Sequence, residues 1–434
     1  MKKNNTLAKV RKTSGYWGAQ MKARFRSKRS TVWALRLLYF FIFIALLGDF
    51  LANEKPLYCK IEGKTYFPVI YQYGVDLGLA QWDASLMRAR WHELSYDAVI
   101  FPPIPYSANT RDIKNTHFAH PFRDQRVDSK RFWHWLGTDQ LGHDVAAGLI
   151  AGTRIALFVG LGAMALASLI GLLLGTLAGY WGDRGLKTSW LRLILNVGGL
   201  YFGLFYGFIS RAYTIGEANV AGSAPMALFT GFLWLAGMLA VANGLGYLLE
   251  KGFRLNKKVH VPLDLLVMRS VEVVESIPGL LLILALAALI RKPSIWYVML
   301  IIGLVGWTSI AQFVRAEMLK VRRQTYIEAA QALGMRASRI MFRHALPNAL
   351  SPVLILIAFG VARAILSEAT LSFLGIGLGP EEVTWGRLLS EARSNFNAWW
   401  LAVFPGVAIF LMVLLFNLLG EGLSDALDPK REEA

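Results

Sequence analysis

A series of long apolar segments is the feature that most restricts how this chain can fold. About 20 apolar residues of α-helix are needed to cross the hydrocarbon core of a bilayer. The segments that reach this length are residues 32–51, 150–181, 191–209, 226–249, 265–290, 295–314, 350–373 and 400–419. Hydrophobic residues make up 55% of the sequence and charged residues 17%, which is typical of a multi-span membrane protein. We therefore predict an all-α integral membrane protein with about eight spans.

The basic residues are concentrated between these segments. Residues 2–29 carry many Lys and Arg but no acidic residue, and further basic clusters occupy 251–258 and 320–343. The positive-inside rule places all three on the cytoplasmic side. An even number of spans that begins inside also ends inside, in agreement with the charged tail 430–434. The net charge of +17 does not indicate nucleic acid, which would need basic residues interleaved with exposed aromatics on a folded domain.

The first apolar segment is predicted to be an anchor and not a cleaved signal peptide. The basic region before it is too long, the apolar run is long enough to span, and no small-residue cleavage pattern follows. Residues 53–148 carry both charge signs, many aromatics and turn-forming prolines. Long loops are exempt from the positive-inside count, so we expect a small extracytoplasmic domain or an ordered loop there. Cys59 is the only cysteine, which excludes an internal disulfide and a Cys-rich metal site.

The basic segment 320–347 differs from a simple connection between spans. Residues 326–333 are predicted to form a short alanine-rich helix that ends at Gly334, a residue suited to the left-handed conformation. Ser338 is expected to cap a second short helix over 339–344, and Pro347 to open the next long helix. Such a pair of short amphipathic helices is useful if a partner outside the membrane binds it. Ala329 and Ala330 would present a thin face that lets this partner approach closely.

The spacing within this segment resembles the coupling loop of bacterial ABC-importer permeases. Their pattern is Glu-Ala-Ala, three residues, Gly, nine residues, Ile, any residue and Leu-Pro. The matching residues here are Glu328, Ala329, Ala330, Gly334, Leu346 and Pro347. His344 stands at the Ile position, a departure common in the dipeptide/oligopeptide/nickel branch. The resemblance implies that the loop docks into a groove of a cytoplasmic ATPase; the alternative is a basic loop that only connects two spans.

Further strings carry the same likeness over roughly residues 135–182 and 263–429. Gly137-Thr138-Asp139 with Gly142 and Asp144 matches a signature before the second span, although His143 replaces the usual Arg. The other matching strings begin at Glu368 (EATLSFLG), Trp385 (WG), Phe404 (FPG), Phe416 (FNLLG) and Asp425 (DALDP). The enlarged region 53–148 is similar, more loosely, to the loop of the oligopeptide and microcin-type permeases. The implied fold is the type I transmembrane domain of ABC importers.

Residues 186–261 depart from the family, which passes directly from the second span to the next. We predict two inserted spans, because one would move the coupling loop to the wrong side of the membrane, and we expect them to pack at the periphery. The predicted parts are a basic cytoplasmic N-terminus (1–30), an anchor (31–52), the extracytoplasmic region (53–148), a core segment (149–185), the inserted pair (186–261), the permease core with its coupling loop (262–429, with 320–347) and a cytoplasmic tail (430–434).

Four residues are candidates for the translocation pore or for kinks beside it. Pro278 and Gly279 break a predicted span, which is tolerated where backbone lines a water-filled cavity, or where a helix simply kinks against its neighbours. Arg363 and Glu368 are ionisable residues in an apolar span and are costly unless they are paired or face a cavity. Because they are five residues apart on a helix, we expect separate partners, with structural pairing favoured over substrate contact.

Three glycines at four-residue spacing, Gly171, Gly175 and Gly179, would let another helix approach closely. Packing within this chain is favoured over contact with a second subunit.

The resemblance implies a permease subunit of an ATP-driven importer for peptides or peptide-like solutes in the bacterial inner membrane. Its implied partners are a second, usually different permease, two ATPase subunits, an external substrate-binding protein and the lipid bilayer. We expect no catalytic residue, cofactor or metal: Gly63-Lys64-Thr65 lacks the preceding glycine of a phosphate loop, since Tyr58 stands there. The alternatives are a system for nickel or another small solute, an exporter with the same loop, and an ATPase-independent channel or membrane enzyme.

Overall fold

The computed structural model describes residues 28–83, 89–123, 125–211, 224–253, 258–290, 294–379 and 381–427, with residues 25, 86 and 214 singly. The predicted cytoplasmic N-terminus and tail therefore lie almost wholly outside the described residues. Seven described helices are long and apolar enough to cross a membrane, or up to eight if one bent pair counts as a span. The expectation of a helical, multi-span protein is confirmed.

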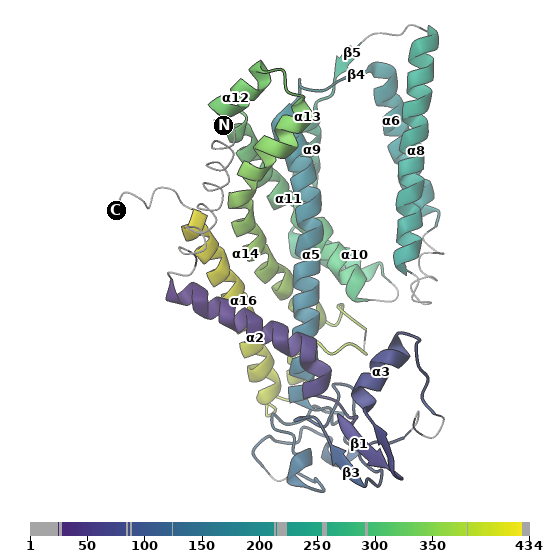
Figure 1. Cartoon of the computed structure of the whole chain (residues 1–434), viewed down its shortest axis with the longest axis vertical. Coiled ribbons are helices and arrows are strands. Elements are labelled where there is room, and N and C mark those ends of the chain that lie inside the picture. Colours follow the sequence, from purple (N-terminus) through teal and green to yellow (C-terminus); the bar gives the residue numbers. More distant parts are fainter. Residues whose placement is uncertain are drawn as a thin grey trace, which may run out of the picture. The chain divides into compact units, whose positions relative to one another are not determined.

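Two compact units divide the chain (Figure 1). The first comprises Met1–Leu166, Ser294–Leu304 and Leu354–Ala434, and the second comprises Ala167–Pro293 and Val305–Val353. The helices α5 (Val145–Trp181), α11 (Ile295–Val321) and α14 (Leu346–Phe373) each run from one unit into the other. The remaining elements of the first unit are α2 (Arg29–Leu51), β1 (Tyr58–Ile61), β2 (Lys64–Tyr66), α3 (Pro68–Asp76), β3 (Ala98–Ile100), η1 (Ile113–Asn115), η2 (Lys130–Phe132), α15 (Trp385–Ala392) and α16 (Trp400–Leu427).

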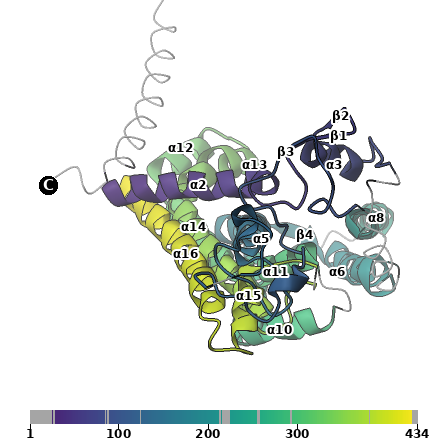
Figure 2. The same cartoon turned by 90° about the horizontal axis from the view of Figure 1, so that it is seen from below.

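In the first unit, the beginning of α2 packs against the end of α16, and the two helices then diverge (Figure 2). The side chain of Thr31 fills the space over Gly422, where a Cβ would have no room. Lys28 forms ion pairs with Glu421, at 2.9 Å, and with Asp425. These contacts fix the beginning of α2 to the end of α16.

The other end of α2 is held by α5. Asp49 accepts a hydrogen bond of 2.9 Å from the Arg154 guanidinium, and the Arg154 Nε donates to the Ala45 carbonyl at 3.0 Å. A Cβ on Gly48 would lie 3.2 Å from the Ile150 side chain, so the two helices approach closely here. An aspartate and an arginine that would be costly alone in an apolar span thus satisfy each other.

Between α2 and α5 lies a small domain (residues 53–144). Its sheet has the order β2-β1-β3, all antiparallel, and Cys59 pairs with Tyr66 on one side and Val99 on the other. Cys59 is fully buried. Helix α3 follows β2 directly and begins with Pro68, whose missing N–H is no loss in a first helical turn. The described residues of this region thus carry an antiparallel sheet and a short helix, and the extracytoplasmic placement of 53–148 stays a prediction.

The second unit contains the glycine stripe of α5. A Cβ on Gly171 would lie 2.7 Å from the Ile310 side chain, and one on Gly175 would lie 2.5 Å from the Ala311 carbonyl oxygen. Gly179 faces α11 in the same way, beside Arg315 and Met318. The prediction of packing within the chain is confirmed, because only glycine lets α5 and α11 approach this closely.

The inserted segment also belongs to the second unit. Its elements are β4 (Lys187–Ser189), α6 (Trp190–Leu204), the π-helical turn η3 (Phe205–Ile209), α8 (Ala224–Phe253) and β5 (Lys258–His260). Strand β4 pairs with β5 in antiparallel register and closes the base of the α6–α8 pair. Asn196 and Asn243 exchange amide hydrogen bonds of 2.8 and 3.2 Å between the two helices. Trp190–Ile209, which is α6 together with η3, and Phe229–Lys251 of α8 are each long and apolar enough to cross a membrane. The predicted inserted pair of spans is therefore present.

The remaining elements of the second unit are α9 (Leu263–Glu275), α10 (Gly279–Ala288), α12 (Thr325–Ala332), α13 (Ala337–Ile340) and the π-helical turn η4 (Met341–Ala345). Helices α9 and α10 form the bent pair, with an angle of 81° between them. The break predicted at Pro278-Gly279 is therefore real: Pro278 is the N-cap of α10 and Gly279 its first residue.

Candidate functional site

Helix α12 carries the Glu-Ala-Ala residues and has one buried face. Ile327 and Ala330 are buried, whereas Glu328 and Ala329 are exposed. The sequence interpretation placed Ala329 and Ala330 together on an open face; the structure corrects this, because adjacent helical residues diverge by about 100° and Ala330 follows Ile327 inward. Of the two alanines of the motif, only Ala329 is exposed.

Gly334 ends α12 in the left-handed conformation that was predicted, with a φ of +73°. Its N–H donates to the Gln331 carbonyl at 2.9 Å, and the Met335 N–H donates to the Ala330 carbonyl at 3.2 Å. These are the two hydrogen bonds of a Schellman motif, which satisfies the last carbonyls of the helix. The turn leaves Leu333, with 82% of its surface exposed, at the tip.

The second half of the loop differs from the prediction. Helix α13 begins at Ala337, and its N-cap Arg336 makes no side-chain capping bond, so the Ser338 cap is wrong. The chain then stays helical through η4 into α14, so that Ala337–Phe373 forms one continuous helix that is long and apolar enough to cross a membrane. Pro347 therefore lies in the first turn of α14 without a break before it. The wider π turn, in which the Leu346 N–H donates to the Met341 carbonyl, gives the proline ring room and absorbs its missing donor.

The side chains of Tyr326 and Gln331 tie α12 to the spanning helices of its unit. The Asn348 amide donates to the Tyr326 hydroxyl at 3.1 Å and to the His344 carbonyl at 2.7 Å. The side chains of Tyr180 and Gln331 are also hydrogen-bonded. Helix α12 is thus attached to both α14 and α5.

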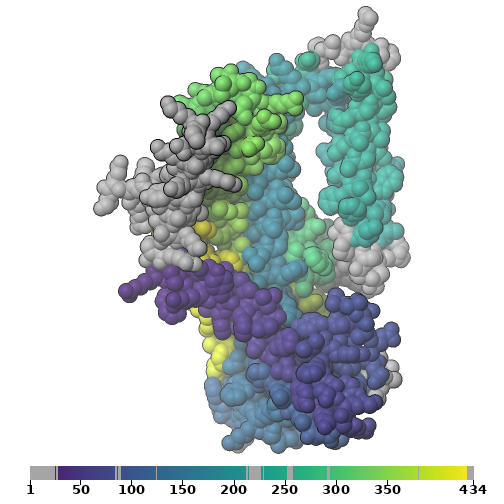
Figure 3. All heavy atoms as spheres, in the orientation of Figure 1, coloured from purple at the N-terminus to yellow at the C-terminus, as the bar shows by residue number. Residues whose placement is uncertain are grey.

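The open surface of this region combines exposed apolar side chains with exposed arginines; Figure 3 shows it in green at the top of the view. We define the coupling surface as its exposed members: Arg322, Arg323, Tyr326, Glu328, Ala329, Leu333, Gly334, Arg336, Arg339, Phe342, Arg343 and Pro347. An apolar tip surrounded by basic residues is typical of a site that another protein covers. His344 and Leu346 are half-buried beneath this surface.

The break between α9 and α10 lies on an exposed part of the second unit. Residues Glu275–Leu281 are exposed throughout, and the nearest heavy atom to a Cβ on Gly279 would be 4.0 Å away on Val305. Nearby polar groups are paired: Arg269 with Glu272 at 2.6 Å, and Glu275 with the Gln312 amide at 3.0 Å. The backbone break itself remains open to whatever adjoins the chain.

Glu368 and Arg363 do not come together, and their surroundings are opposite. Glu368 is buried and accepts a hydrogen bond of 2.8 Å from Ser372. Gly386 of α15 lies against the carbonyl of the next residue, Ala369, and against Ser372, so Glu368 belongs to the α14–α15 packing. Arg363 is exposed and has no ion pair or hydrogen bond with any residue that the structure describes.

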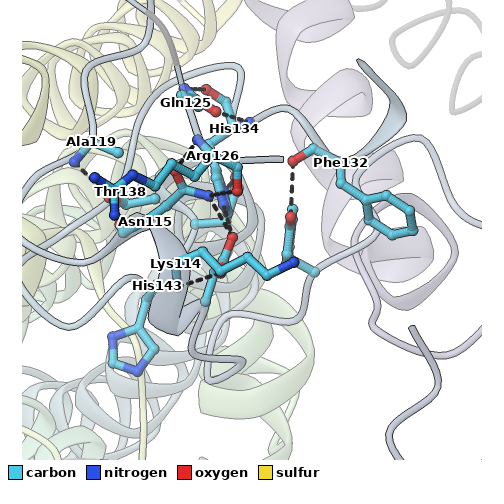
Figure 4. Close-up of polar contacts among 12 residues, drawn as sticks. Lys114, Asn115, Ala119, Gln125, Arg126, Phe132, His134, Thr138 and His143 are labelled. Atoms are coloured by element: carbon cyan, nitrogen blue, oxygen red, sulfur yellow. Dashed lines mark hydrogen bonds and ion pairs between the residues drawn. The ribbon is translucent and has the colours of Figure 1, made fainter. Parts of the chain in front are cut away.

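A polar cluster at the beginning of α5 was not found from the sequence (Figure 4). His134 is buried between two carboxylates, with Nδ1 2.8 Å from Asp144 and Nε2 3.2 Å from Asp112. Burial opposes the charged imidazolium, but the hydrogen bonds to both aspartates outweigh it and raise the pKa of His134. Burial would raise the pKa of Asp112, yet the bonds from His134, Asn115 and the Lys114 N–H lower it to about 2.

The motif Gly137-Thr138-Asp139 shapes the adjoining loop. The Thr138 hydroxyl donates to the Asn115 carbonyl at 2.7 Å and accepts from the Ala119 N–H at 2.9 Å. His143, which stands at the usual Arg position, lies 2.6 Å from the Asp139 carboxylate through Nδ1. Trp400 donates to the Thr138 carbonyl at 3.0 Å. The motif therefore joins the small domain to the beginning of α16.

Comparison with known proteins agrees with these features. Residues 242–433 match the family described as binding-protein-dependent transport system inner membrane component. The chain is 29% identical over 418 residues, 94% of its length and 96% of the relative, to the inner membrane ABC transporter permease protein YejE of Escherichia coli (strain K12). It is 28% identical over 319 residues (73% and 79%) to the dipeptide transport system permease protein DppC of Alkalihalophilus pseudofirmus.

A third relative, the glutathione transport system permease protein GsiD of Pectobacterium atrosepticum, is 30% identical over 301 residues, 68% of this chain and 73% of the relative. The spans, the glycine-packed α5–α11 pair and the coupling motif thus occur in a sequence that aligns with permeases over most of its length. The chain belongs to the family of binding-protein-dependent ABC importer permeases of the peptide type, multi-span proteins of the inner membrane with the type I transmembrane fold.

Proposed function

We propose that this permease forms part of the translocation pore of an ATP-driven importer for peptides or peptide-like solutes, and that its coupling surface docks on a cytoplasmic ATPase. The observation that carries the proposal is Leu333, exposed at the end of α12 beside the left-handed Gly334, in a segment whose arginines are also exposed. A soluble partner would bury this side chain, and full burial would contribute about 1.5–3 kcal/mol to the binding free energy.

The helix after the coupling surface supplies the transmission. Because α13, η4 and α14 form one continuous helix, a displacement of the loop by the ATPase moves α14 as a rigid element. The Tyr326–Asn348 and Tyr180–Gln331 contacts make α12 move with α14 and α5. Nucleotide-driven closure of the ATPases would then bias the spans between outward-open and inward-open arrangements.

Arg363 and the Pro278-Gly279 break are better candidates than Glu368 for residues that line the translocation pore. An exposed charge and an exposed backbone break are tolerated at membrane depth where they face water or another subunit. Arg363 and Gly279 meet that description on the described part of the chain, whereas Glu368 is enclosed by α15. Glu368 is therefore assigned to packing.

The same reasoning gives the assembly and its orientation. The α12–α13 end is cytoplasmic, the small domain is extracytoplasmic, and both termini are cytoplasmic. A second, different permease completes the pore. Two ATPase subunits dock from the cytoplasmic side, and a substrate-binding protein delivers cargo from the extracytoplasmic side. This assignment rests on the basic loops and on the family resemblance.

The test compares two glycines of similar backbone strain, one at the end of α12 and the other just after α14. Gly334 and Gly375 have φ values of +73° and +76°, and a Cβ on either meets no atom within 4 Å. Gly334→Val should abolish co-purification of the ATPase and ATP-dependent uptake of labelled peptides into vesicles, while Gly375→Val should retain both. Normal ATPase binding by Gly334→Val would contradict the docking site, and uptake of Ni²⁺ in place of peptides would contradict the cargo.

A further inference from the structure

Helix α3 of the small domain and the two residues that flank it expose large apolar side chains on one side. Phe67, Ile70, Tyr71 and Leu77 recur at helical spacing, with Gly74 between them, and all four large side chains are exposed. Ile70 keeps 56% and Leu77 73% of its surface. Ile70, Gly74 and Leu77 are spaced as i, i+4 and i+7 on one helix face, with Tyr71 beside them and Phe67 at the N-cap. We call the four exposed side chains the apolar strip; a Cβ on Gly74, within it, would lie 3.5 Å from Ala80.

The opposite side of α3 is fully used by the domain. Pro68 and Val69 are buried in it. Gln72 accepts hydrogen bonds from Lys55 at 2.5 Å and from the Trp82 indole at 2.8 Å, and its amide donates to Asp76 at 2.6 Å. The strip is therefore a surface feature of a well-anchored helix.

Helix α3 contacts the Leu51 end of α2, a helix long and apolar enough to cross a membrane. The Tyr73 hydroxyl donates to Asp49 at 2.6 Å, and the Tyr73 ring stacks on Phe50 with centroids 6.4 Å apart. One turn further along α2, Phe43 and Leu46 are exposed apolar residues of a membrane span. Figure 1 shows α3 beside this end of α2, on the side of the sheet from which the span rises.

We propose that α3 is an interfacial helix whose apolar strip lies in the bilayer leaflet at the Leu51 end of α2. An amphipathic helix attached to the end of a span lies in the interface with its apolar face toward the acyl chains. Tyr71 and Trp82, whose rings are 4.5 Å apart, hold the amphipathic position that such side chains take at the membrane surface. The small domain is thereby fixed against the membrane at a second point besides α2.

The test measures membrane depth at single cysteines. Cys59, the only cysteine of the chain, is first replaced by Ser, and Ile70→Cys and Leu77→Cys are labelled with an environment-sensitive fluorophore in proteoliposomes without binding protein. Leu46→Cys is the lipid-exposed control and Lys64→Cys, on the exposed strand β2 of the same domain, is the water-exposed control. Quenching is measured with nitroxide-bearing lipids and with aqueous iodide.

Labels at positions 70 and 77 should follow position 46, with lipid quenching several-fold greater than at position 64 and with protection from iodide. Iodide quenching equal to that at position 64 would overturn the proposal. If added binding protein then shielded these two sites, the strip would be its docking surface, which also overturns the proposal. The readout is independent of ATPase docking, so the proposed coupling function stands or falls separately.

Discussion

Truncating Leu333 tests the docking argument without disturbing the fold. The side chain is 82% exposed in the isolated chain, so Leu333→Ala removes almost no buried surface from the permease itself. If the ATPase covers this residue, the substitution removes roughly 1.5–2 kcal/mol of burial at the interface. Each 1.4 kcal/mol is about tenfold in affinity, so the dissociation constant should rise by about 10- to 30-fold.

The assay is direct binding of the purified ATPase to the permease in nanodiscs, followed at several ATPase concentrations. Leu79→Ala is the matched control, because Leu79 is 81% exposed but lies in the small domain after α3. Both variants should keep the thermal unfolding midpoint of the parent protein. A Leu333→Ala variant that binds the ATPase as tightly as Leu79→Ala would refute the assignment of this surface.

Three further outcomes are expected. Gly175→Val should lower the free energy of unfolding of the detergent-solubilised permease by about 1–3 kcal/mol or more, because the valine side chain would collide with the Ala311 carbonyl. Gly237→Val on α8 is the control, because a Cβ there meets open space. Equal thermal unfolding midpoints of the two variants would count against the glycine-packed α5–α11 pair. Burial and the nearby Asp139 raise the pKa of Glu391 to about 8, so protonated Glu391 favours the folded state. This stabilisation is full below the ordinary glutamate pKa and declines as the pH rises from there toward about 8. Glu391→Gln should flatten this decline in unfolding midpoints measured between those two pKa values, and an unchanged slope would contradict the assignment. Cysteine labelling should find position 217 extracytoplasmic and position 257 cytoplasmic, both outside the described residues; reaction from the same side would reject the proposed threading of the inserted pair.

Local sequence signals were sufficient wherever neighbouring residues decide the structure. The end of α12 at Gly334 follows from the backbone freedom of glycine, and the α9–α10 break follows from Pro278 lacking a donor. The same reasoning failed at Ser338, because a capping residue acts only where a helix actually starts. Here the segment stays helical through η4 into α14, and the π turn that permits this is not marked by any residue type.

The polar cluster around His134 shows what local reasoning cannot reach. Asp112, His134 and Asp144 lie far apart in the sequence, and each alone resembles a loop residue. Their convergence depends on the small domain folding against the beginning of α5. The burial of Glu368 by α15 is similar, since Gly386 fits over that turn only once the chain has returned from the following loop.

The sequence by itself determined that the chain spans a membrane several times, because the length of each apolar run and the placement of basic residues respond to the bilayer, a solvent whose dimensions are known in advance. That it is a permease followed from the resemblance of its motifs to a known family. The sequence also marked the coupling motif, whose spacing is local. Only the tertiary structure decided which side chains of that motif face outward, which ionisable residues are satisfied, and that α3 carries an exposed apolar strip. Those properties depend on which distant segment packs on each face, and this information is carried by packing and not by periodicity.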